Sequence, residues 1–346
     1  MATVSILGAG SWGTALACHL ARSGHRVRLW ARSASHAAVL ADVKENTRYL
    51  PGVSIPSGVT VTADLPASLR GSEAVVFAVP SHAFGETVSL ARPYLPPVPV
   101  INAAKGIEED TLRRLSQVWA DLTGDRELQR YCALSGPSHA EELGRAMPTA
   151  LVAASPVSAV AEFAQDLFMS PCLRVYTNRD LTGVETGGAL KNIIAVATGV
   201  SDGLGFGDNT RAALMTRGLA EITRLGVRMG ANPLTFAGLT GVGDLIVTCT
   251  SMHSRNRRFG MAVGRGLSVQ EALVEVSQIV EGVRTTRAAT RLAVRFGVEL
   301  PIARQVYAIL FEGLTPSEGV NLLMTRQRRH EIEEVALYGI AWKTPE

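Results

Sequence analysis

The chain has few cysteines, and they follow no disulfide or metal-binding pattern. The four of them, Cys18, Cys132, Cys172 and Cys249, are scattered along 346 residues and form no C-x-x-C pair. The seven histidines show no H-x-x-x-H or Cys/His spacing. We therefore expect buried free thiols, a reducing compartment and no structural metal.

A strong excess of one charge is also absent. Lysine and arginine together number 34 against 31 acidic residues, which gives a net charge of +3, and the Arg-rich pieces 255–258 and 326–329 are short. So small an excess speaks against a nucleic-acid partner, although it suits a small anionic substrate.

Long apolar runs are missing as well. No uncharged run approaches the roughly 18 residues that a membrane span needs, because the best candidate, 193–200, is too short and follows Lys191. The chain also opens without the charged and apolar regions of a signal peptide, since a strand is predicted from Val4. We therefore expect a cytoplasmic protein with no membrane span.

The composition is otherwise that of a globular protein. With 47% hydrophobic and 19% charged residues, the chain can form a sizeable core. Its length is enough for about two domains, and no exact repeat or low-complexity linker divides it.

A glycine motif stands near the start of the chain. The apolar run from Val4 to Leu7 leads into G-x-G-x-x-G at Gly8, Gly10 and Gly13, and a helical pattern follows at once. A strand, a tight turn and a helix in this order are typical of dinucleotide binding. Gly8 would permit the turn, Gly10 the approach of a pyrophosphate, and Gly13 the packing of helix on strand. The N–H groups at the helix start would face the phosphates.

The second predicted strand, 26–30, ends without the carboxylate that binds the ribose 2′-hydroxyl in NAD-selective folds. The residues that follow are Ala31, Arg32 and Ser33. Arg32 could contact a 2′-phosphate or stack on the adenine, and the alternative is a solvated surface arginine. We interpret Arg32 as a cofactor contact and leave the cofactor as NAD or NADP.

Further strands alternate with helices up to about Tyr176. The predicted strands are 59–62, 73–79, 98–103, 131–134, 149–153 and 173–176, with a helix over 159–168. Such alternation implies a mostly parallel sheet with right-handed crossovers, as in a Rossmann-type domain. From Asp180 onward the apolar spacing is helical, with clear turn signals between the segments.

We therefore predict an α/β fold in which a Rossmann-type, mostly parallel sheet domain is followed by an all-helical substrate domain. The dinucleotide-binding domain would span 1–179 and the substrate domain 180–330, with a C-terminal extension over 331–346 to which we assign no function. A cleft between two such domains is the usual place for a substrate.

Two strand ends carry candidate contacts, because ligands of parallel sheets bind at the carboxyl ends of strands. Lys105 follows strand 98–103 and could contact substrate or cofactor; a lysine solvated beside a turn is the alternative. After strand 131–134, Ser138 and Glu141 fit a capping box that would start a helix. Backbone N–H groups just before that helix would offer an anion-binding edge.

The first helix of the second domain places Lys191 and Asn192 in a small, apolar surface. Partial desolvation would make the Lys191 proton easier to lose and suit this lysine to acid–base catalysis. The alternatives are a pair with Glu185 or a snorkelling surface lysine.

A further polar block begins at Asp244. On a helix, Asp244 and Thr248 share one face, although Asp244 could also be a plain N-cap. Arg255 has a planar guanidinium suited to a phosphate. The alternative here is a helix capped by Ser254 with a solvated Arg255.

Eight sequence blocks, in order, resemble the bacterial NAD(P)-dependent glycerol-3-phosphate dehydrogenases over nearly the whole chain. The blocks are GAGSWGTALA from Gly8, LWAR from Leu29, NTRYLPG from Asn46, AAKGIE from Ala103, LSGPSHAEE from Leu134, ALKNIIA from Ala189, TGVGDLIVTCTSMHSRN from Thr240 and VEGVRTT from Val280. The resemblance implies interconversion of sn-glycerol 3-phosphate and dihydroxyacetone phosphate, with reduction supplying glycerol phosphate for phospholipid synthesis. It also implies a homodimer.

The resemblance further implies roles for individual residues, with Lys191 as proton donor and acceptor. It places around the substrate Lys105, Gly136, Ser138, Asp244, Ser254, Arg255 and Asn256. It places around the cofactor Ser11, Trp12, Arg32, Lys105, Ala140, Arg255 and Glu281. Ser33 departs from the second basic residue that many members carry, which weakens a preference for NADP.

These residue types suit the implied reaction. Negative charge builds on the carbonyl oxygen of dihydroxyacetone phosphate as its carbon is reduced, and an ammonium at Lys191 can stabilise that charge and deliver the proton. Lys105 and Arg255 would add positive charge, and Asp244 would orient Lys191. Asn192 and Thr248 would supply hydrogen bonds. No metal is needed for this chemistry.

Two other functions stay open at this point. One is a related two-domain dehydrogenase that acts on another hydroxy acid or a sugar derivative. The other is a cofactor-binding sensor without catalysis, which would have little reason to carry Lys105, Lys191, Asp244 and Arg255 together.

Overall fold

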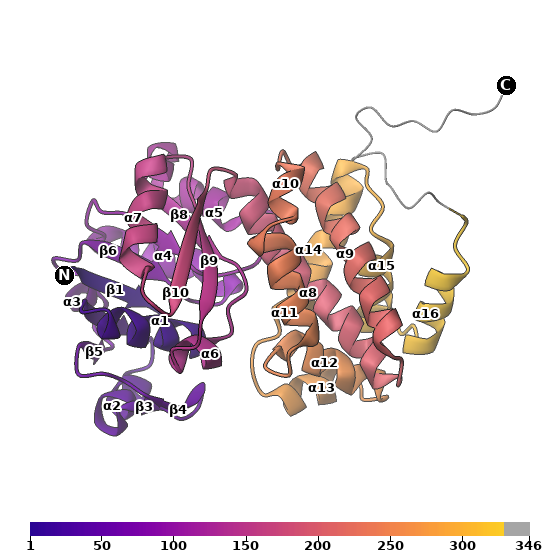
Figure 1. The fold of residues 1–346 in the computed structure, drawn as a ribbon, viewed down its shortest axis with the longest axis horizontal. Helices are drawn as coiled ribbons and strands as arrows, with labels where there is room; N and C mark the ends of the chain where they lie inside the picture. Colours follow the sequence, from indigo (N-terminus) through magenta and orange to yellow (C-terminus); the bar gives the residue numbers. More distant parts are fainter. Residues whose placement is uncertain (329–346) are drawn as a thin grey trace.

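The computed structural model describes residues 1–328, with a sheet domain at the left of Figure 1 and a helical domain at the right. The strands are β1 (Thr3–Leu7), β2 (Arg26–Trp30), β3 (Glu45–Asn46), β4 (Leu50–Ser54), β5 (Val59–Thr62), β6 (Ala74–Phe77), β7 (Val100–Asn102), β8 (Tyr131–Ser135), β9 (Thr149–Ala154) and β10 (Leu173–Asn178).

Helices connect the strands and build the second domain. In the sheet domain they are α1 (Ser11–Arg22), α2 (Ala34–Val43), α3 (Leu65–Leu69), α4 (Phe84–Ala91), α5 (Leu115–Thr123), α6 (Ala140–Gly144) and α7 (Ser158–Phe168), with the short turns η1 (Ser81–Ala83), η2 (Arg92–Tyr94) and η3 (Asp125–Arg130). The helical domain holds α8 (Leu181–Gly203), α9 (Asp208–Arg228), α10 (Pro233–Phe236), η4 (Leu239–Gly243), α11 (Asp244–Thr250), α12 (Arg255–Gly264), α13 (Val269–Val276), α14 (Glu281–Phe296), α15 (Pro301–Phe311) and α16 (Pro316–Met324).

One eight-stranded sheet has the strand order β10-β9-β8-β7-β6-β1-β2-β5. β1 lies inside it, parallel to β2 on one side and to β6 on the other. The strand order therefore reverses between β1 and β6. The crevice outside the carboxyl ends of these two strands is the place where open α/β sheets bind their ligands.

The predicted fold class is confirmed. β2 has the predicted bounds, whereas the predicted strand 98–103 is shorter, at Val100–Asn102. Two features were not predicted: β9 runs antiparallel to β8, and β3 and β4 form a separate antiparallel hairpin. Apolar spacing identifies a strand but not its direction, which depends on how the connecting loop crosses the sheet.

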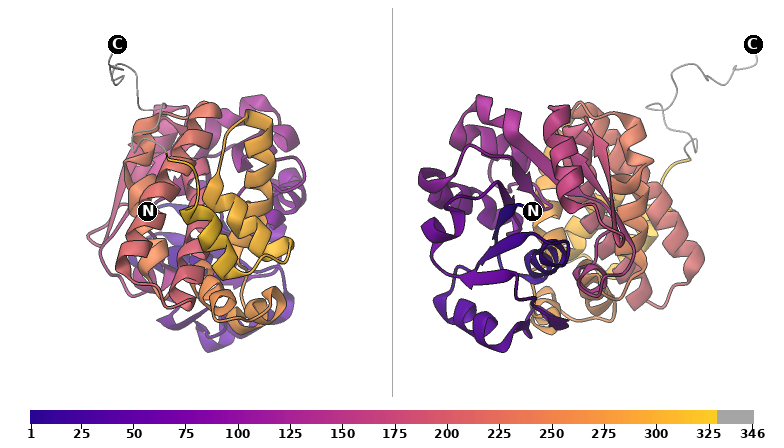
Figure 2. Two further views of the ribbon diagram at one scale, coloured as in Figure 1. Left: turned by 90° about the vertical axis from the view of Figure 1, so that its right-hand side faces the viewer. Right: turned by 60° about the vertical axis from the view of Figure 1, so that its left-hand side comes forward.

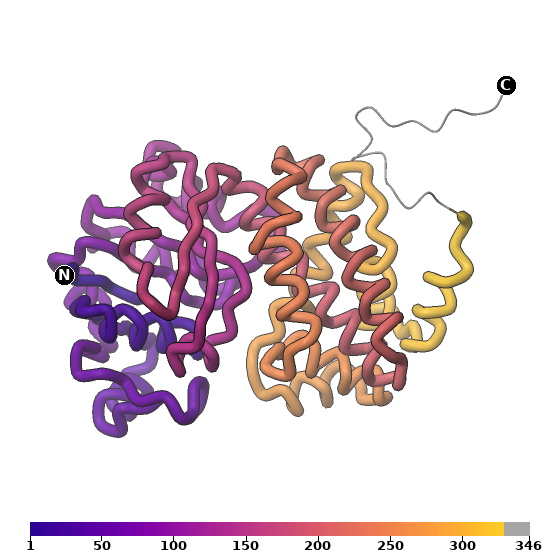
Figure 3. The backbone as a smooth tube through the Cα atoms, viewed as in Figure 1, coloured from indigo at the N-terminus to yellow at the C-terminus, as the bar shows by residue number. Residues whose placement is uncertain are grey.

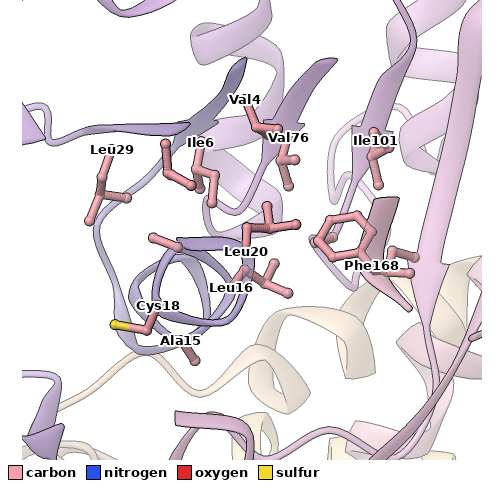
Figure 4. Packing of buried hydrophobic residues seen from close by; sticks show 14 of the residues in the cluster. Val4, Ile6, Ala15, Leu16, Cys18, Leu20, Leu29, Val76, Ile101 and Phe168 are labelled. Atoms are coloured by element: carbon pink, nitrogen blue, oxygen red, sulfur yellow. The ribbon is translucent and has the colours of Figure 1, made fainter. Parts of the chain in front are cut away.

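The sheet domain has two hydrophobic clusters, and one of them lies between the central strands and α1. Leu16 and Leu20 of α1 face Val4, Ile6 and Val76, and all five side chains are fully buried (Figure 4). Burying one such side chain stabilises a fold by roughly 1.5–3 kcal/mol. This packing therefore holds the start of α1 against the carboxyl end of β1.

The glycine loop between β1 and α1 has the geometry that its motif predicted. Gly8 has a φ of 116°, in the left-handed region that favours glycine. A Cβ on Gly13 would overlap the carbonyl oxygen of Gly8, whereas a Cβ on Gly10 would meet no atom within 4 Å. Gly13 thus lets the helix pack on the turn, and Gly10 leaves the space that a pyrophosphate would need.

Asn46 of β3 holds this loop in place, a role that was not predicted. Its side-chain amide donates to the carbonyl oxygen of Ala9 at 3.1 Å and to the hydroxyl of Thr14 at 2.7 Å. Both acceptors belong to the glycine loop and the first turn of α1. The hairpin therefore supports the loop from the side.

The chain passes into the helical domain between β10 and α8, where we place the domain boundary (Figure 3). α8 is buried from Gly183 to Ser201. α12 crosses α8 at close range, because a Cβ on Gly260 would overlap the carbonyl oxygen of Val196. α16 lies at the end of the domain that is farthest from the sheet (Figures 1 and 2). Within residues 1–328, no helix is long and apolar enough to cross a membrane.

Gly13→Ala is expected to destabilise the protein by about 1–3 kcal/mol, because the added methyl group must displace backbone. In an ordinary helix the same change would stabilise by up to about 1 kcal/mol. The control is Gly10→Ala, which meets open space and should keep the unfolding free energy within about 0.5 kcal/mol of the wild type. Urea denaturation measures both, and equal stabilities would contradict the packing role of Gly13.

Candidate active site

Lys191 occupies the middle of α8 and is 6% exposed. Its Nζ donates to a carboxylate oxygen of Asp244 and, at 2.7 Å, to the hydroxyl of Thr248. Asp244 and Thr248 lie one turn apart on α11, on the shared face that their spacing predicted. The alternative of a snorkelling surface lysine is therefore wrong.

Lys105 reaches the same carboxylate from the sheet domain. It follows β7, and its Nζ donates to the second carboxylate oxygen of Asp244 at 2.8 Å. The same ammonium donates to the carbonyl oxygen of Gly136 at 2.8 Å and to the hydroxyl of Ser138 at 3.0 Å. Asp244 thus joins two ammonium groups that come from different domains.

Burial and charge set the protonation of Lys191 and Asp244, which together with Lys105 we call the lysine cluster. Burial lowers the pKa of Lys191 from 10.5 to about 8; Asp244 opposes that shift and Lys105 adds to it. Burial alone would raise the pKa of Asp244, but the two ammonium groups outweigh it and hold that pKa below its ordinary value. At neutral pH the site therefore pairs an ionised aspartate with a lysine that releases its proton readily, as acid–base catalysis requires.

A π-helical turn, η4, directly precedes Asp244. Such turns are frequent at functional sites. A Cβ on Gly241 of this turn would overlap backbone of Phe236, and one on Gly187 of α8 would lie 2.7 Å from the carbonyl oxygen of Thr240. These glycines let the turn pack against α8 close to Lys191. The carboxylate of Asp244 binds the lysines, so the plain N-cap interpretation is wrong.

The capping box predicted at Ser138 and Glu141 is also wrong. α6 begins at Ala140 with His139 as its N-cap, and the Ser138 hydroxyl donates to the carbonyl oxygen of Gly136 at 2.8 Å. The φ of Gly136 is 118°, so the chain turns sharply there and the helix starts later. Ser138 is thereby left facing Lys105.

A chain of polar groups continues from Asn192, the neighbour of Lys191. The Asn256 side chain donates to the Asn192 side-chain oxygen at 2.9 Å and accepts from the backbone N–H of Gly282 at 2.8 Å. Both asparagines are buried. The close crossing of α8 and α12 brings them together, although 64 residues separate them in the chain.

Ser254 and Arg255 lie at the start of α12. The Ser254 hydroxyl accepts from the backbone N–H of Arg257 at 3.2 Å, so the predicted capping alternative is confirmed for this serine. Its hydroxyl proton is still free to donate to a ligand. Arg255 is half-buried and donates weakly, at 3.5 Å, to the carbonyl oxygen of Ile279. Among the described residues it has no hydrogen bond to the lysine cluster.

Ser11 and Trp12 form the first turn of α1, which has neither an acidic residue nor a side-chain cap. The Trp12 indole nitrogen is buried and has no partner within residues 1–328. Uncapped N–H groups, this orphaned donor and the open space at Gly10 together fit a dinucleotide pyrophosphate.

Arg32 is exposed just beyond the end of β2, and Ser33 caps α2 by accepting from the His36 N–H at 3.3 Å.

Glu281, at the start of α14, binds a strand end of the sheet domain. Its carboxylate accepts from the backbone N–H of Ser81 at 3.0 Å and from the Ser81 hydroxyl at 2.6 Å. Ser81 begins η1, just after β6, at the crevice where the cofactor is expected. Ser81 is not among the predicted site residues, because the only signal for it in the sequence is its place after a buried strand.

Glu185 forms a buried contact between the domains, and not a pair with Lys191. It accepts from Arg114 at 2.7 Å, from the backbone N–H of Ser116 at 2.8 Å and from the hydroxyl of Tyr131 at 3.0 Å. Six residues along a helix turn a side chain to another face, which is why the alternative pairing with Lys191 is wrong.

Asp244→Asn is expected to lower the unfolding free energy by about 3 kcal/mol at pH 7, because it leaves a buried ammonium without its counter-charge. Chemical denaturation measures this loss. The double variant Lys191→Met with Asp244→Asn removes the buried charge too and should recover part of the stability. If the double variant were no more stable than Asp244→Asn, the loss would not be electrostatic.

Known proteins match this chain over most of its length. Residues 3–161 match the model of the NAD-dependent glycerol-3-phosphate dehydrogenase N-terminus, and 180–321 that of the C-terminus. A Pelotomaculum thermopropionicum protein, glycerol-3-phosphate dehydrogenase [NAD(P)+], is 61% identical over 335 residues, 96% of either chain. The structure is similar to that of glycerol-3-phosphate dehydrogenase from Coxiella burnetii, with TM-score 0.90 and 40% identity over 94% of this chain and 99% of that one.

A more distant similarity concerns the fold alone. A ketopantoate reductase of the PanE/ApbA family from Ralstonia eutropha has a TM-score of 0.59 and 18% identity, covering 92% of this chain and 99% of its own. The two-domain arrangement is thus shared with other reductases. The two family models and the relatives of high identity, in contrast, point to one family of dehydrogenases. The expected family, its dehydrogenase class and its nicotinamide cofactor are confirmed: the chain belongs to the NAD-dependent glycerol-3-phosphate dehydrogenase family.

Proposed function

We propose that this protein interconverts sn-glycerol 3-phosphate and dihydroxyacetone phosphate with NAD or NADP, and that Lys191 is its general acid and base. The observation that carries the proposal is the buried pair of Lys191 and Asp244, which the partly buried Lys105 joins from the carboxyl end of a dinucleotide-type sheet. Membership of the family supports the choice of substrate.

The residues that would hold the dinucleotide are those of the glycine loop and the first turn of α1, with Ala140 at the start of α6 and Arg32 beyond β2. When bound, the nicotinamide supplies or accepts the hydride at the substrate carbon. The chain's own contribution at the pyrophosphate is a set of N–H donors at a helix N-terminus without a competing acid.

At the reacting oxygen, the Lys191 ammonium would stabilise the negative charge that develops on reduction and donate its proton. Thr248 and Asp244 orient the Nζ, since both bind it. Lys105 adds a second positive charge next to the same carboxylate. In the reverse direction the neutral amine of Lys191 would take the hydroxyl proton.

Residues around this cluster would bind the phosphate and the remaining hydroxyl. Arg255 offers a planar guanidinium, and Ser254 a hydroxyl proton that its capping role does not use. The paired Asn192 and Asn256 keep side-chain donors near the start of α12. Ser138, with the turn at Gly136, would complete the substrate contacts from the sheet domain.

We further propose a cytoplasmic homodimer that works in the direction of reduction and supplies glycerol phosphate for phospholipid synthesis.

The direct test of the proposed reaction is the initial rate of NADH or NADPH oxidation with dihydroxyacetone phosphate. A protein without such activity on either cofactor would overturn the proposal.

Lys191→Ala should lower kcat by about 100- to 1,000-fold, because a transition-state donor is lost, and should leave the Kd for the dinucleotide unchanged. Initial rates and fluorescence titration with NADH measure the two quantities. Near-normal turnover would refute the acid–base role of Lys191.

The same lysine predicts opposite pH dependences for the two directions. Reduction needs the ammonium, so its rate should fall as the pH rises through about 8, whereas oxidation needs the amine and should rise over the same range. Rates without such a change near this pH would contradict the assignment.

Arg255→Ala should raise KM for dihydroxyacetone phosphate far more than KM for the unphosphorylated dihydroxyacetone. The loss of a charged hydrogen bond corresponds to roughly 1.5–3 kcal/mol, or about a 10- to 150-fold change in KM. Arg304→Ala, which changes an exposed arginine of α15 paired with Glu312, is the matched control. Equal losses with both substrates would argue against a phosphate contact.

A further inference from the structure

The loop that carries Lys105 is held by the helical domain. It connects β7 to α5, and its side chains Ile107 and Leu112 pack into the hydrophobic core of that domain. Ile107 is 2% exposed. The loop belongs to the sheet domain by sequence but is anchored in the other domain by burial.

Between these two apolar anchors, α14 holds the loop with three arginines. Glu109 accepts from Arg287 at 3.1 Å and lies 3.8 Å from the guanidinium of Arg284. Arg291 donates to the carbonyl oxygens of Glu109 at 2.7 Å and of Asp110 at 3.3 Å. One carboxylate and two carbonyl groups of the loop are therefore bound to a single helix face.

The same helix also holds the neighbouring strand end. Its first residue, Glu281, binds Ser81, and a Cβ on Gly106 would overlap the Ser81 side chain. Gly106 directly follows Lys105. Both strand ends at the crevice, after β6 and after β7, are thus held against α14.

We propose that Glu109 is a positioning residue, whose contacts with the arginines of α14 hold the loop so that Lys105 stays bound to Asp244. This inference rests on the proposed function. Glu109 is four residues from Lys105 and touches no part of the lysine cluster among the described contacts, so it acts through the loop. An isolated surface ion pair contributes about 0–1 kcal/mol, but here several contacts share one loop.

The position of Lys105 matters for Lys191. The groups that face Lys191 are Asp244 and Cys249 of α11, Lys105, and His139 before α6. Burial keeps the thiol of Cys249 protonated, with a pKa of about 12, and lowers the pKa of His139. At the pH of an assay, Lys105 and Asp244 are therefore the charges that tune Lys191, and movement of Lys105 away from it would raise the Lys191 pKa.

The test is Glu109→Gln, which keeps the shape of the side chain and removes its charge. We expect kcat/KM for dihydroxyacetone phosphate to fall by about 3- to 10-fold and the pH midpoint of the reduction rate to move upward. The control is Glu275→Gln, which breaks an exposed arginine pair at 2.7 Å inside the helical domain and should change neither quantity. In the double variant Glu109→Gln with Arg287→Gln, kcat/KM should fall by less than the product of the two single-variant fold losses, because both changes break the same contact.

Hydrogen–deuterium exchange of residues 106–112 gives a readout that needs no turnover. We expect faster exchange there in Glu109→Gln than in the wild type or in Glu275→Gln. Unchanged exchange, or an unmoved pH midpoint in an active variant, would overturn the positioning role. An inactive wild-type protein would overturn the proposed function, while the exchange experiment would still test whether Glu109 holds the loop.

Discussion

One carboxylate, that of Asp244, determines the arrangement of the candidate active site. It is 1% exposed and binds Lys191 of the helical domain and Lys105 of the sheet domain. The buried ammonium of Lys191 would be unstable without it, and a buried carboxylate without the two lysines would take up a proton. The three charges therefore stabilise one another, and their contact requires the two domains to meet in one orientation.

Close packing and polar contacts surround Asp244 and hold the two domains together. Glycines in α8, η4 and α12 let backbones approach so closely that Asp244 and Asn256 reach the same stretch of α8. Across the domain boundary, Glu185 binds Arg114 and Ser116, and α14 holds the ends of β6 and β7. The position of Lys191, the proposed catalytic lysine, thus depends on contacts formed by elements far apart in the chain.

Much of this organisation could be predicted from local patterns. The glycine motif predicted the geometry of Gly8, Gly10 and Gly13, and helical spacing put Asp244 and Thr248 on one face. Contacts between distant segments could not be predicted in this way. The six-residue spacing separates Glu185 from Lys191 on the helix, but it does not reveal that Glu185 meets Arg114 or that Asn46 supports the glycine loop, because those pairings depend on tertiary packing. The capping box at Ser138 failed because the left-handed turn at Gly136 delays the helix.

The proposed role of Lys191 depends on an ammonium whose pKa burial lowers, although its ion pair with Asp244 opposes that shift. The most direct measurement is an NMR titration of the lysine side chains in the wild-type protein, with the Lys191 signal assigned by comparison with Lys191→Ala. This signal is expected to titrate at about pH 8. Titration near the ordinary lysine value of about 10.4 would contradict it.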